Sequence, residues 1–321
     1  MLKYIVKRII IAIPVFLGIS IVVFAMVQAM PGGPFSQLVL DPNISQEYID
    51  RLMDEYGLND PVPVQYVKWL GRFFRGDLGT STAYNRPALE IILGRLPNTI
   101  LLGLTSLVVS SLIGIPIGVW ISTRRGSLAD NIATCFCFFG ISVPAFFFGM
   151  ILILIFSMVL KVLPTSGMVT AGANYVGWAY AVDVLRHMIL PTVVLSLLNV
   201  ASFMRYTRSA MIDVIGQDYI RTARAKGVSN KDVIMKHAFK NALIPIITII
   251  SLQIPGVLSG ALLTETIFVW PGIGQLNYQA VQNRDYFLIM GIVMMLAVAT
   301  LLINLVADVL YAVVDPRIRY D

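Results

Sequence analysis

The chain alternates long apolar stretches with shorter polar ones. Six apolar stretches are each about 20 residues or longer, enough for a helix to cross the hydrocarbon core of a bilayer. They cover residues 9–30, 99–121, 132–160, 188–207, 242–266 and 287–314. Runs of about ten residues that alternate apolar and polar positions, as in transmembrane β-strands, are absent from the sequence. The pattern predicts an all-α polytopic membrane protein with six transmembrane helices.

The polar stretches indicate how the chain is divided. The apolar run within residues 1–30 is longer than that of a cleaved signal peptide, which favours an uncleaved anchor helix. Residues 31–98 are too long for a simple connection and carry helix signals of their own. We expect 31–98 to form a folded segment outside the cytoplasm, 99–314 to form a five-helix core with a polar loop at 205–241, and 315–321 to form a tail.

Two amphipathic helices are predicted within the outer segment 31–98. Ser45 is a candidate N-cap for the first helix, and Ile44 and Ile49 occupy the two positions of a hydrophobic staple. The apolar stripe of this helix comprises Ile49, Leu52, Met53 and Tyr56. The second helix, 65–74, places Tyr66, Val67, Leu70, Phe73 and Phe74 toward one side, with Trp69 nearby. Such a helix suits the headgroup layer of a membrane or the mouth of a pathway.

Proline and glycine occur within several of the apolar stretches. The third stretch contains Gly140, Pro144 and Gly149. Lipid tolerates such residues only where neighbouring helices satisfy the freed backbone groups, and prolines put bends at fixed places. We expect a bundle of bendable helices, which suits close packing and also suits a gate.

Composition and charge support a membrane protein and orient it. Hydrophobic residues make up 57% of the chain and charged residues 13%, and the mean hydropathy of +0.78 lies outside the range of soluble proteins. Most of the 24 Lys and Arg fall in segments that share one side if both termini are inside. Because basic residues near span ends stay in the cytoplasm, we expect cytoplasmic N- and C-termini. The same bias explains much of the net charge of +6, so no nucleic-acid partner is indicated.

The polar loop 205–241 carries eight Lys or Arg against three Asp. Asp218 is a candidate N-cap for a helix over 219–226, and Gly227 follows where helices often end in a left-handed residue. Ser229 is a candidate N-cap for a second short helix, with Asp232 at the capping-box position. Basic inner loops are common, but the two caps predict a folded element of helix, glycine elbow and helix.

The basic residues of this loop are arranged along its first predicted helix. Arg221 and Arg224 are three residues apart and share one helix face. Lys226 stands in the last turn, where a positive charge complements the helix dipole. We interpret this face as a docking surface for a partner with an acidic groove.

The sequence contains none of the common motifs for catalysis or nucleotide binding. A G-x-x-x-x-G-K-[ST] phosphate loop, an H-E-x-x-H zinc motif and a G-x-S-x-G nucleophile elbow are all absent. The two histidines, His187 and His237, are far apart in the sequence, and Cys135 and Cys137 point to different helix faces within an apolar stretch. We predict no catalytic residue, no metal site and no cofactor bound by this chain.

Ionisable residues inside the apolar stretches are scarce and costly, so each calls for a role. Glu265 is predicted near the outer end of the fifth span, in a structural role. Asp308 follows Asn304 by one turn in the inner half of the sixth span, and this pair either lines a water-filled path or braces the bundle. The candidate path residues are Asn199, Gln253, Asn304 and Asp308.

Two stretches of the polar loop resemble a known family. Tyr219-Ile-Arg-Thr-Ala-Arg-Ala-Lys-Gly227 and His237-Ala-Phe-Lys-Asn-Ala-Leu-Ile-Pro245 are similar to the E-A-A-x-x-x-G coupling loop of permease subunits in bacterial ATP-binding-cassette (ABC) importers. The closest likeness is to the first, B-type permease of dipeptide and oligopeptide systems. It extends along nearly the whole chain, through 76–79, 123–126, 265–274 and 315–320. Arg221 stands where the general motif has Glu and Thr222 where it has Ala, so no role of that Glu is carried over.

The resemblance implies a type I importer permease fold of the MetI-like kind, in the bacterial cytoplasmic membrane. It implies a second homologous permease, two cytoplasmic ATPases that bind ATP and Mg²⁺, and an extracytoplasmic peptide-binding protein. Members of the family carry dipeptides, oligopeptides, glutathione or nickel complexes. The residues expected to couple to the ATPases are Asp218, Tyr219, Arg221, Thr222, Ala223, Arg224, Ala225, Lys226, Gly227, His237 and Asn241. A secondary transporter driven by an ion gradient is the main alternative, and a membrane scaffold without a pathway is the second.

Overall fold

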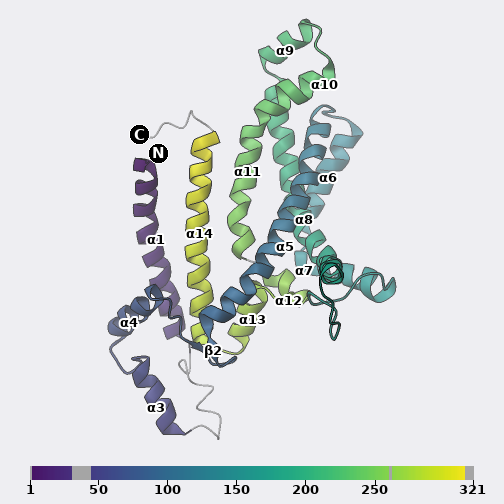
Figure 1. Cartoon of the computed structure of the whole chain (residues 1–321). Helices are drawn as coiled ribbons and strands as arrows, with labels where there is room; N and C mark the ends of the chain where they lie inside the picture. Colours follow the sequence, from purple (N-terminus) through teal and green to yellow (C-terminus); the bar gives the residue numbers. More distant parts are fainter. Residues whose placement is uncertain (1, 31–44, 260–261, 315–321) are drawn as a thin grey trace.

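The computed structural model of the chain describes residues 2–30, 45–259 and 262–314. Long helices run side by side between two ends of the molecule (Figure 1). These helices are α1 (Leu2–Gln28), α5 (Ala88–Ser122), α8 (Trp178–Ile215), α11 (Lys240–Ser259) and α14 (Tyr286–Val314). Within the described residues, five helices are long and apolar enough to cross a membrane, or six if one bent pair counts as a single span. The predicted all-α membrane fold is confirmed, with one very short β-hairpin added.

The bent pair occupies the third predicted span, 132–160. Instead of one straight helix, the chain forms α6 (Leu128–Ser142), then α7 (Ala145–Leu152) and the π-helical segment η1 (Ile153–Val159). The two parts meet at an angle of 99°. Val143 is extended because the ring of Pro144 disfavours helical geometry in the residue before it. A bend at this proline was expected, and the pair completes the six predicted spans if it counts as one broken span.

Helices α5 and α8 lie against each other, and glycines let their backbones come close. A Cβ atom added at Gly114 would lie 2.8 Å from the Val200 carbonyl oxygen, and one at Gly118 would lie 2.7 Å from Thr207 Cβ. Small residues at such contacts are typical of helix packing in membranes. These glycines therefore make α5 and α8 the tightly packed centre of the bundle.

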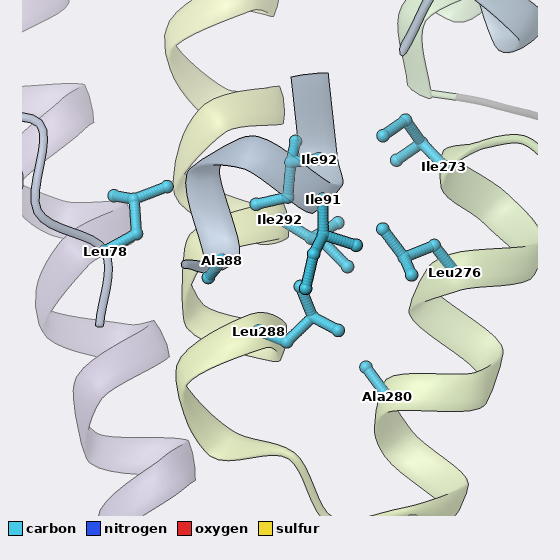
Figure 2. Close-up of a cluster of buried hydrophobic side chains, with 9 residues drawn as sticks. All are labelled: Leu78, Ala88, Ile91, Ile92, Ile273, Leu276, Ala280, Leu288 and Ile292. Atoms are coloured by element: carbon cyan, nitrogen blue, oxygen red, sulfur yellow. The ribbon is translucent and has the colours of Figure 1, made fainter. Parts of the chain in front are cut away.

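Helix α5 begins earlier than the predicted second span, so the proposed boundary at 98/99 falls inside it. Its first turns pack in the largest buried apolar cluster, between α13 (Ile273–Gln282) and the start of α14. Figure 2 shows this cluster, made of Leu78, Ala88, Ile91, Ile92, Ile273, Leu276, Ala280, Leu288 and Ile292. The apolar spacing of 88–92 continues the helix outward because it has this surface to cover.

The first outer helix, α3 (Gln46–Glu55), forms as predicted. The Ser45 hydroxyl caps it by accepting a hydrogen bond from the Tyr48 backbone N–H. Ile49 is buried against Phe287 at the start of α14, with Leu52, Met53 and Tyr56 beside it. The other predicted staple residue, Ile44, lies outside the described residues.

The second outer helix, α4 (Val62–Phe74), packs through most of the predicted stripe, since Tyr66, Leu70 and Phe73 lie against the cluster that holds Trp69. Trp69 is buried against Val23 and Val27 of α1, whereas Val67 and Phe74 are exposed. The Trp69 ring lies 5.6 Å from the ring of Phe24, centroid to centroid. Trp69 is therefore the buried aromatic residue of α4, because α1 packs over it, and the apolar pattern of α4 alone does not show this.

The hairpin of β1 (Thr80–Ser81) and β2 (Arg86–Pro87) fastens the outer segment to α14. Asp285, fully buried, accepts hydrogen bonds from the Ser81 hydroxyl and from the Ala83 backbone N–H at 3.1 Å. Its other oxygen accepts from the Leu288 backbone N–H at 3.2 Å. One carboxylate therefore caps α14 and holds the hairpin against it.

Candidate functional site

The polar loop forms a short helix, α9 (Asp218–Ala225), set on the end of the bundle (Figure 1). Ile220 is fully buried and Ala223 nearly so, one turn apart on one face. They pack in an apolar cluster with Met211 of α8 and Ala242 and Ile246 of α11. The opposite face is exposed and carries the remaining predicted coupling residues of the helix, Asp218, Tyr219, Arg221, Thr222, Arg224, Ala225 and Lys226. The helix thus has an apolar seat and a free basic surface.

Gly227 ends α9 in the predicted left-handed conformation, with φ +76°. The Gly227 backbone N–H donates to the Arg224 carbonyl at 3.0 Å, and the Val228 N–H donates to the Ala223 carbonyl at 3.3 Å. These two bonds define a Schellman motif, and Val228 packs in the same apolar cluster as Ala223. The predicted glycine elbow is confirmed.

The predicted start of this helix was wrong by one residue. Gln217 is the N-cap and makes no side-chain capping bond, while Asp218 is the first helical residue. In this position its carboxylate still lies near the positive end of the helix dipole, and it accepts a 3.4 Å hydrogen bond from Arg221. The charge therefore supports the helix without capping it.

The second helix is not separate from the fifth span. Ser229 caps it as predicted, accepting a 3.2 Å bond from the Asp232 backbone N–H. The chain then continues without a break through α10 (Asn230–Asp232), the π-helical segment η2 (Val233–Phe239) and α11. His237 and Asn241 lie on this continuous helix, both exposed, with the Asn241 amide donating to the His237 carbonyl at 2.6 Å. α9 is therefore joined through Gly227 and Ser229 directly to one end of a spanning helix.

Two of the four path candidates share a cavity. Asn199 of α8 and Gln253 of α11 line a space of about 210 Å³ between α5, α8 and α11. The Asn199 amide makes a 3.4 Å contact with the Leu195 carbonyl, and none of the described residues hydrogen-bonds the Gln253 side chain. Both amides are therefore available to a polar solute that enters the cavity.

The other two candidates lie elsewhere. Asn304 and Asp308 line a separate, larger and mostly apolar groove between α1 and α14. Asp308 accepts a salt bridge from Arg8 of α1 at 3.1 Å. The geometry of Asp308 matches the brace, the second of the two roles expected for this residue.

Glu265, expected to be structural, organises the outer wall of the cavity. It lies in α12 (Leu262–Ile267), and only 1% of it is exposed. One carboxylate oxygen accepts from the Thr99 hydroxyl at 3.0 Å, and the other accepts from the backbone N–H groups of Gly274 at 2.7 Å and Gln275 at 3.2 Å. A Cβ atom at Gly272 would overlap with the Glu265 carboxylate, so the residue that follows Pro271 must be glycine. The predicted fifth span, 242–266, crosses residues 260 and 261, which lie outside the described residues.

The ion pair between Asp130 and Arg208 was not predicted. Arg208 of α8 donates from Nε and Nη2 to the two oxygens of Asp130 in α6, at 2.6 and 2.7 Å. Asp130 is 3% exposed, and its carboxylate also accepts from the Gly126 backbone N–H. The pair ties α6 to α8 near the end that carries α9. No local pattern marks it, because the two residues are distant in the sequence.

Among the described residues, no group of three or more His, Cys, Asp or Glu could hold a metal ion. The site thus combines a short helix with an exposed basic face, a continuous spanning helix that follows it, and a cavity lined in part by polar side chains.

Comparisons with known proteins cover the whole chain. The family described as binding-protein-dependent transport system inner membrane component matches residues 114–320. An N-terminal family for membrane components of these transport systems matches residues 1–103. The likeness extends to a solved structure: a chain of the MetNI methionine ABC transporter in inward facing conformations has a TM-score of 0.54. It is 15% identical and covers 71% of this chain and 97% of that chain, so this likeness concerns the fold.

Several curated relatives match from end to end. The oligopeptide transport system permease protein AppB of Bacillus subtilis is 45% identical, over 100% of both chains. The dipeptide transport system permease protein DppB of Escherichia coli K12 is 39% identical, over 100% of this chain and 99% of that one. The glutathione transport system permease protein GsiC of Salmonella paratyphi A is 38% identical, over 100% of both. The chain therefore belongs to the inner-membrane components of binding-protein-dependent transport systems, and within them to the permease subunits of the dipeptide and oligopeptide type.

Proposed function

We propose that this permease imports peptides as part of an ATP-driven complex, and that α9 is the element through which ATP hydrolysis moves it. The observation that carries the proposal is the two-sided build of α9, with a buried apolar seat and an exposed basic face. The peptide substrate is inferred from the transport systems named for the relatives. The partners are a second, similar permease, two cytoplasmic ATPases that bind ATP and Mg²⁺, and an extracytoplasmic peptide-binding protein.

The seat of α9 explains how movement would be transmitted. Ile220 and Ala223 contact side chains from both α8 and α11, so displacement of α9 shifts the inner ends of two spanning helices together. The Schellman motif at Gly227 limits bending between α9 and the continuous helix that follows. Arg221, Arg224 and Lys226 supply positive charge for an acidic cleft in the ATPase. Closure of the ATPase pair would then reorient α8 and α11 around the cavity.

The cavity between α5, α8 and α11 is the proposed part of the translocation path. Asn199 and Gln253 carry amide groups that both donate and accept, and a peptide group needs both kinds of partner. Asn304 and Asp308 were expected along the path as well. We assign them to the groove beside α1, with Asp308 as a brace to Arg8.

The orientation follows from the same proposal. The start of α1, the end of α14 and α9 lie at one end of the molecule (Figure 1). This arrangement allows both termini and α9 to be cytoplasmic, as the distribution of Lys and Arg predicts. The outer helices α3 and α4 then lie on the side where a binding protein arrives, and we propose that residues 45–76 contact it.

The decisive test is charge reversal on α9 in the reconstituted complex. Arg224 and Lys226 are exchanged for Glu together, and ATPase activity and peptide uptake are measured separately. A loss of uptake, with ATPase activity no longer stimulated by the loaded binding protein, supports coupling through α9. Reversal of Arg284 to Glu is the matched control, because Arg284 is exposed and lies between α13 and α14 at the other end of the bundle. Unchanged transport in the double variant would reject the lever.

A second test separates the importer from an ion-driven transporter. The purified chain alone is placed in liposomes with a proton or sodium gradient and a labelled dipeptide. We expect no accumulation without the ATPases and the binding protein. Accumulation by the chain alone would overturn the proposed function.

A further inference from the structure

A second cavity lies further along α8 than the proposed path, beside α6 and not α11. It has a volume of about 230 Å³ and lies between the last turn of α5, the middle of α6 and the inner part of α8. Arg205 and Arg208 form its polar side. Its apolar side consists of Ile121, Cys137, Phe138 and Met204. The cavity is therefore amphipathic, and it shares no lining residue with the cavity that holds Asn199 and Gln253.

The polar side of this cavity carries excess positive charge. Arg208 is held in one orientation by its bidentate bond to Asp130, through Nε and Nη2. Within the described part of the chain, no carboxylate forms an ion pair with Arg205, which is exposed. One acidic group thus faces two guanidinium groups. A planar, fixed guanidinium with donors left over is well suited to a phosphate group.

Aromatic side chains indicate that this cavity lies at a membrane surface. Trp120 and Tyr206 are 47% and 45% exposed. The guanidinium of Arg124 lies 4.5 Å from the Trp120 ring centre, and that of Arg205 lies 5.1 Å from the Tyr206 ring centre. Tryptophan, tyrosine and arginine gather where the hydrocarbon core meets the lipid headgroups. The neighbouring Phe138 is 64% exposed, so an apolar surface begins directly beside the arginines.

We propose that this cavity binds an anionic phospholipid. The phosphate lies between Arg205 and Arg208, and the acyl chains extend over Phe138 along the exposed side of α6. Charge complementarity, the mixed polar and apolar lining and the position at the headgroup level all support this occupant. The inference is independent of the proposed peptide path, because the two cavities share no lining residue.

The test measures lipid binding by the purified complex. The complex is placed in nanodiscs of phosphatidylcholine with or without phosphatidylglycerol, and retained lipid is identified by native mass spectrometry. Fluorescent phosphatidylglycerol gives an affinity by titration. Arg205→Gln should weaken this affinity about tenfold, because one charge-assisted contact is lost. Arg205→Lys should retain most of it, and Arg284→Gln, between α13 and α14 at the opposite end of the bundle, should leave it unchanged.

The outcomes that overturn the proposal are equally specific. Equal affinity in Arg205→Gln and the unaltered protein would show that Arg205 does not bind the headgroup. Equal retention of both lipids would exclude charge recognition. Full displacement of the lipid by inorganic phosphate alone would indicate a site for a free anion. Binding to the isolated chain but not to the complex would show that a partner subunit fills the cavity. Arg208 is left unaltered in all variants because its loss would strand the buried Asp130.

Discussion

The packing of α5 against α8 makes a sharp prediction for Gly118→Ala. A methyl group at this position would lie 2.7 Å from Thr207 Cβ and 2.8 Å from the Met204 carbonyl oxygen. Carbon atoms pack best at about 3.5–4.0 Å, so the contact is about 0.8 Å too short. The Met204 oxygen is a backbone atom and Thr207 Cβ is bonded directly to the backbone, so neither can move aside as the end of a flexible side chain could. The two helices must separate instead.

The cost follows from two opposing effects. Overpacking of this kind costs about 1–3 kcal/mol, and the better helix propensity of alanine returns up to about 1 kcal/mol. We therefore expect a net loss of about 0–3 kcal/mol against the unaltered protein, and of about 1–3 kcal/mol against a control that gains the same helix propensity, both measured as a lower Tm of the purified complex. The matched control is Gly94→Ala in the same helix, where a Cβ atom would meet nothing within 4 Å. If Gly118→Ala is as stable as Gly94→Ala, the close contact between α5 and α8 is refuted.

Three further variants test other parts of the structure by the same measurement. Asp130→Asn should lower the free energy of unfolding by about 3 kcal/mol, and the Tm with it, because Arg208 loses a charged partner in a largely buried site. An unchanged Tm would mean that the pair does not hold α6. Val269→Gly should raise the Tm, since this exposed valine has φ +50° and left-handed geometry costs about 1–2 kcal/mol; a decrease would point to a contact made by its side chain. Glu265→Gln should cost about 1–3 kcal/mol, because an NH₂ group would replace an oxygen that accepts hydrogen bonds; an unchanged Tm would show that the carboxylate is dispensable.

Features with a local signal could be predicted from the sequence. The spans follow from length and apolarity, and the caps at Ser45 and Ser229 follow from residue type and spacing. Gly227 was predicted because a helix that ends before another cap often ends in a left-handed glycine. Each of these depends on neighbours within a few residues, so the chain itself carries the information.

Features that depend on distant neighbours could not be predicted. Asp285 finds its partners in the hairpin near residue 81, and Asp130 finds Arg208 two helices away. The packing of α4 depends on the surface of α1, so Trp69 is buried there with Tyr66, Leu70 and Phe73, while Val67 of the same predicted stripe is exposed. The polar start of the fifth helix also hides its continuation into the apolar span, since the cap at Ser229 resembles that of a separate short helix. Pairing between elements decides all of these, and single-sequence patterns do not record it.

The winding of the helix formed by η2 and α11 sets the direction in which α9 points. A π-turn is an α-helix that holds one extra residue, and each residue of an α-helix turns the chain by about 100°. A π-turn fits its extra residue into one widened turn, so deleting one residue within 233–239 would restore regular winding and leave α9 facing nearly the same way. Deleting one residue from the regular turns of α11 would instead rotate α9 by about 100° about the axis of the span. Its basic surface would then face a different quadrant beneath the bilayer. Segment length, as much as residue identity, thus constrains which variants of this loop can still meet their partner.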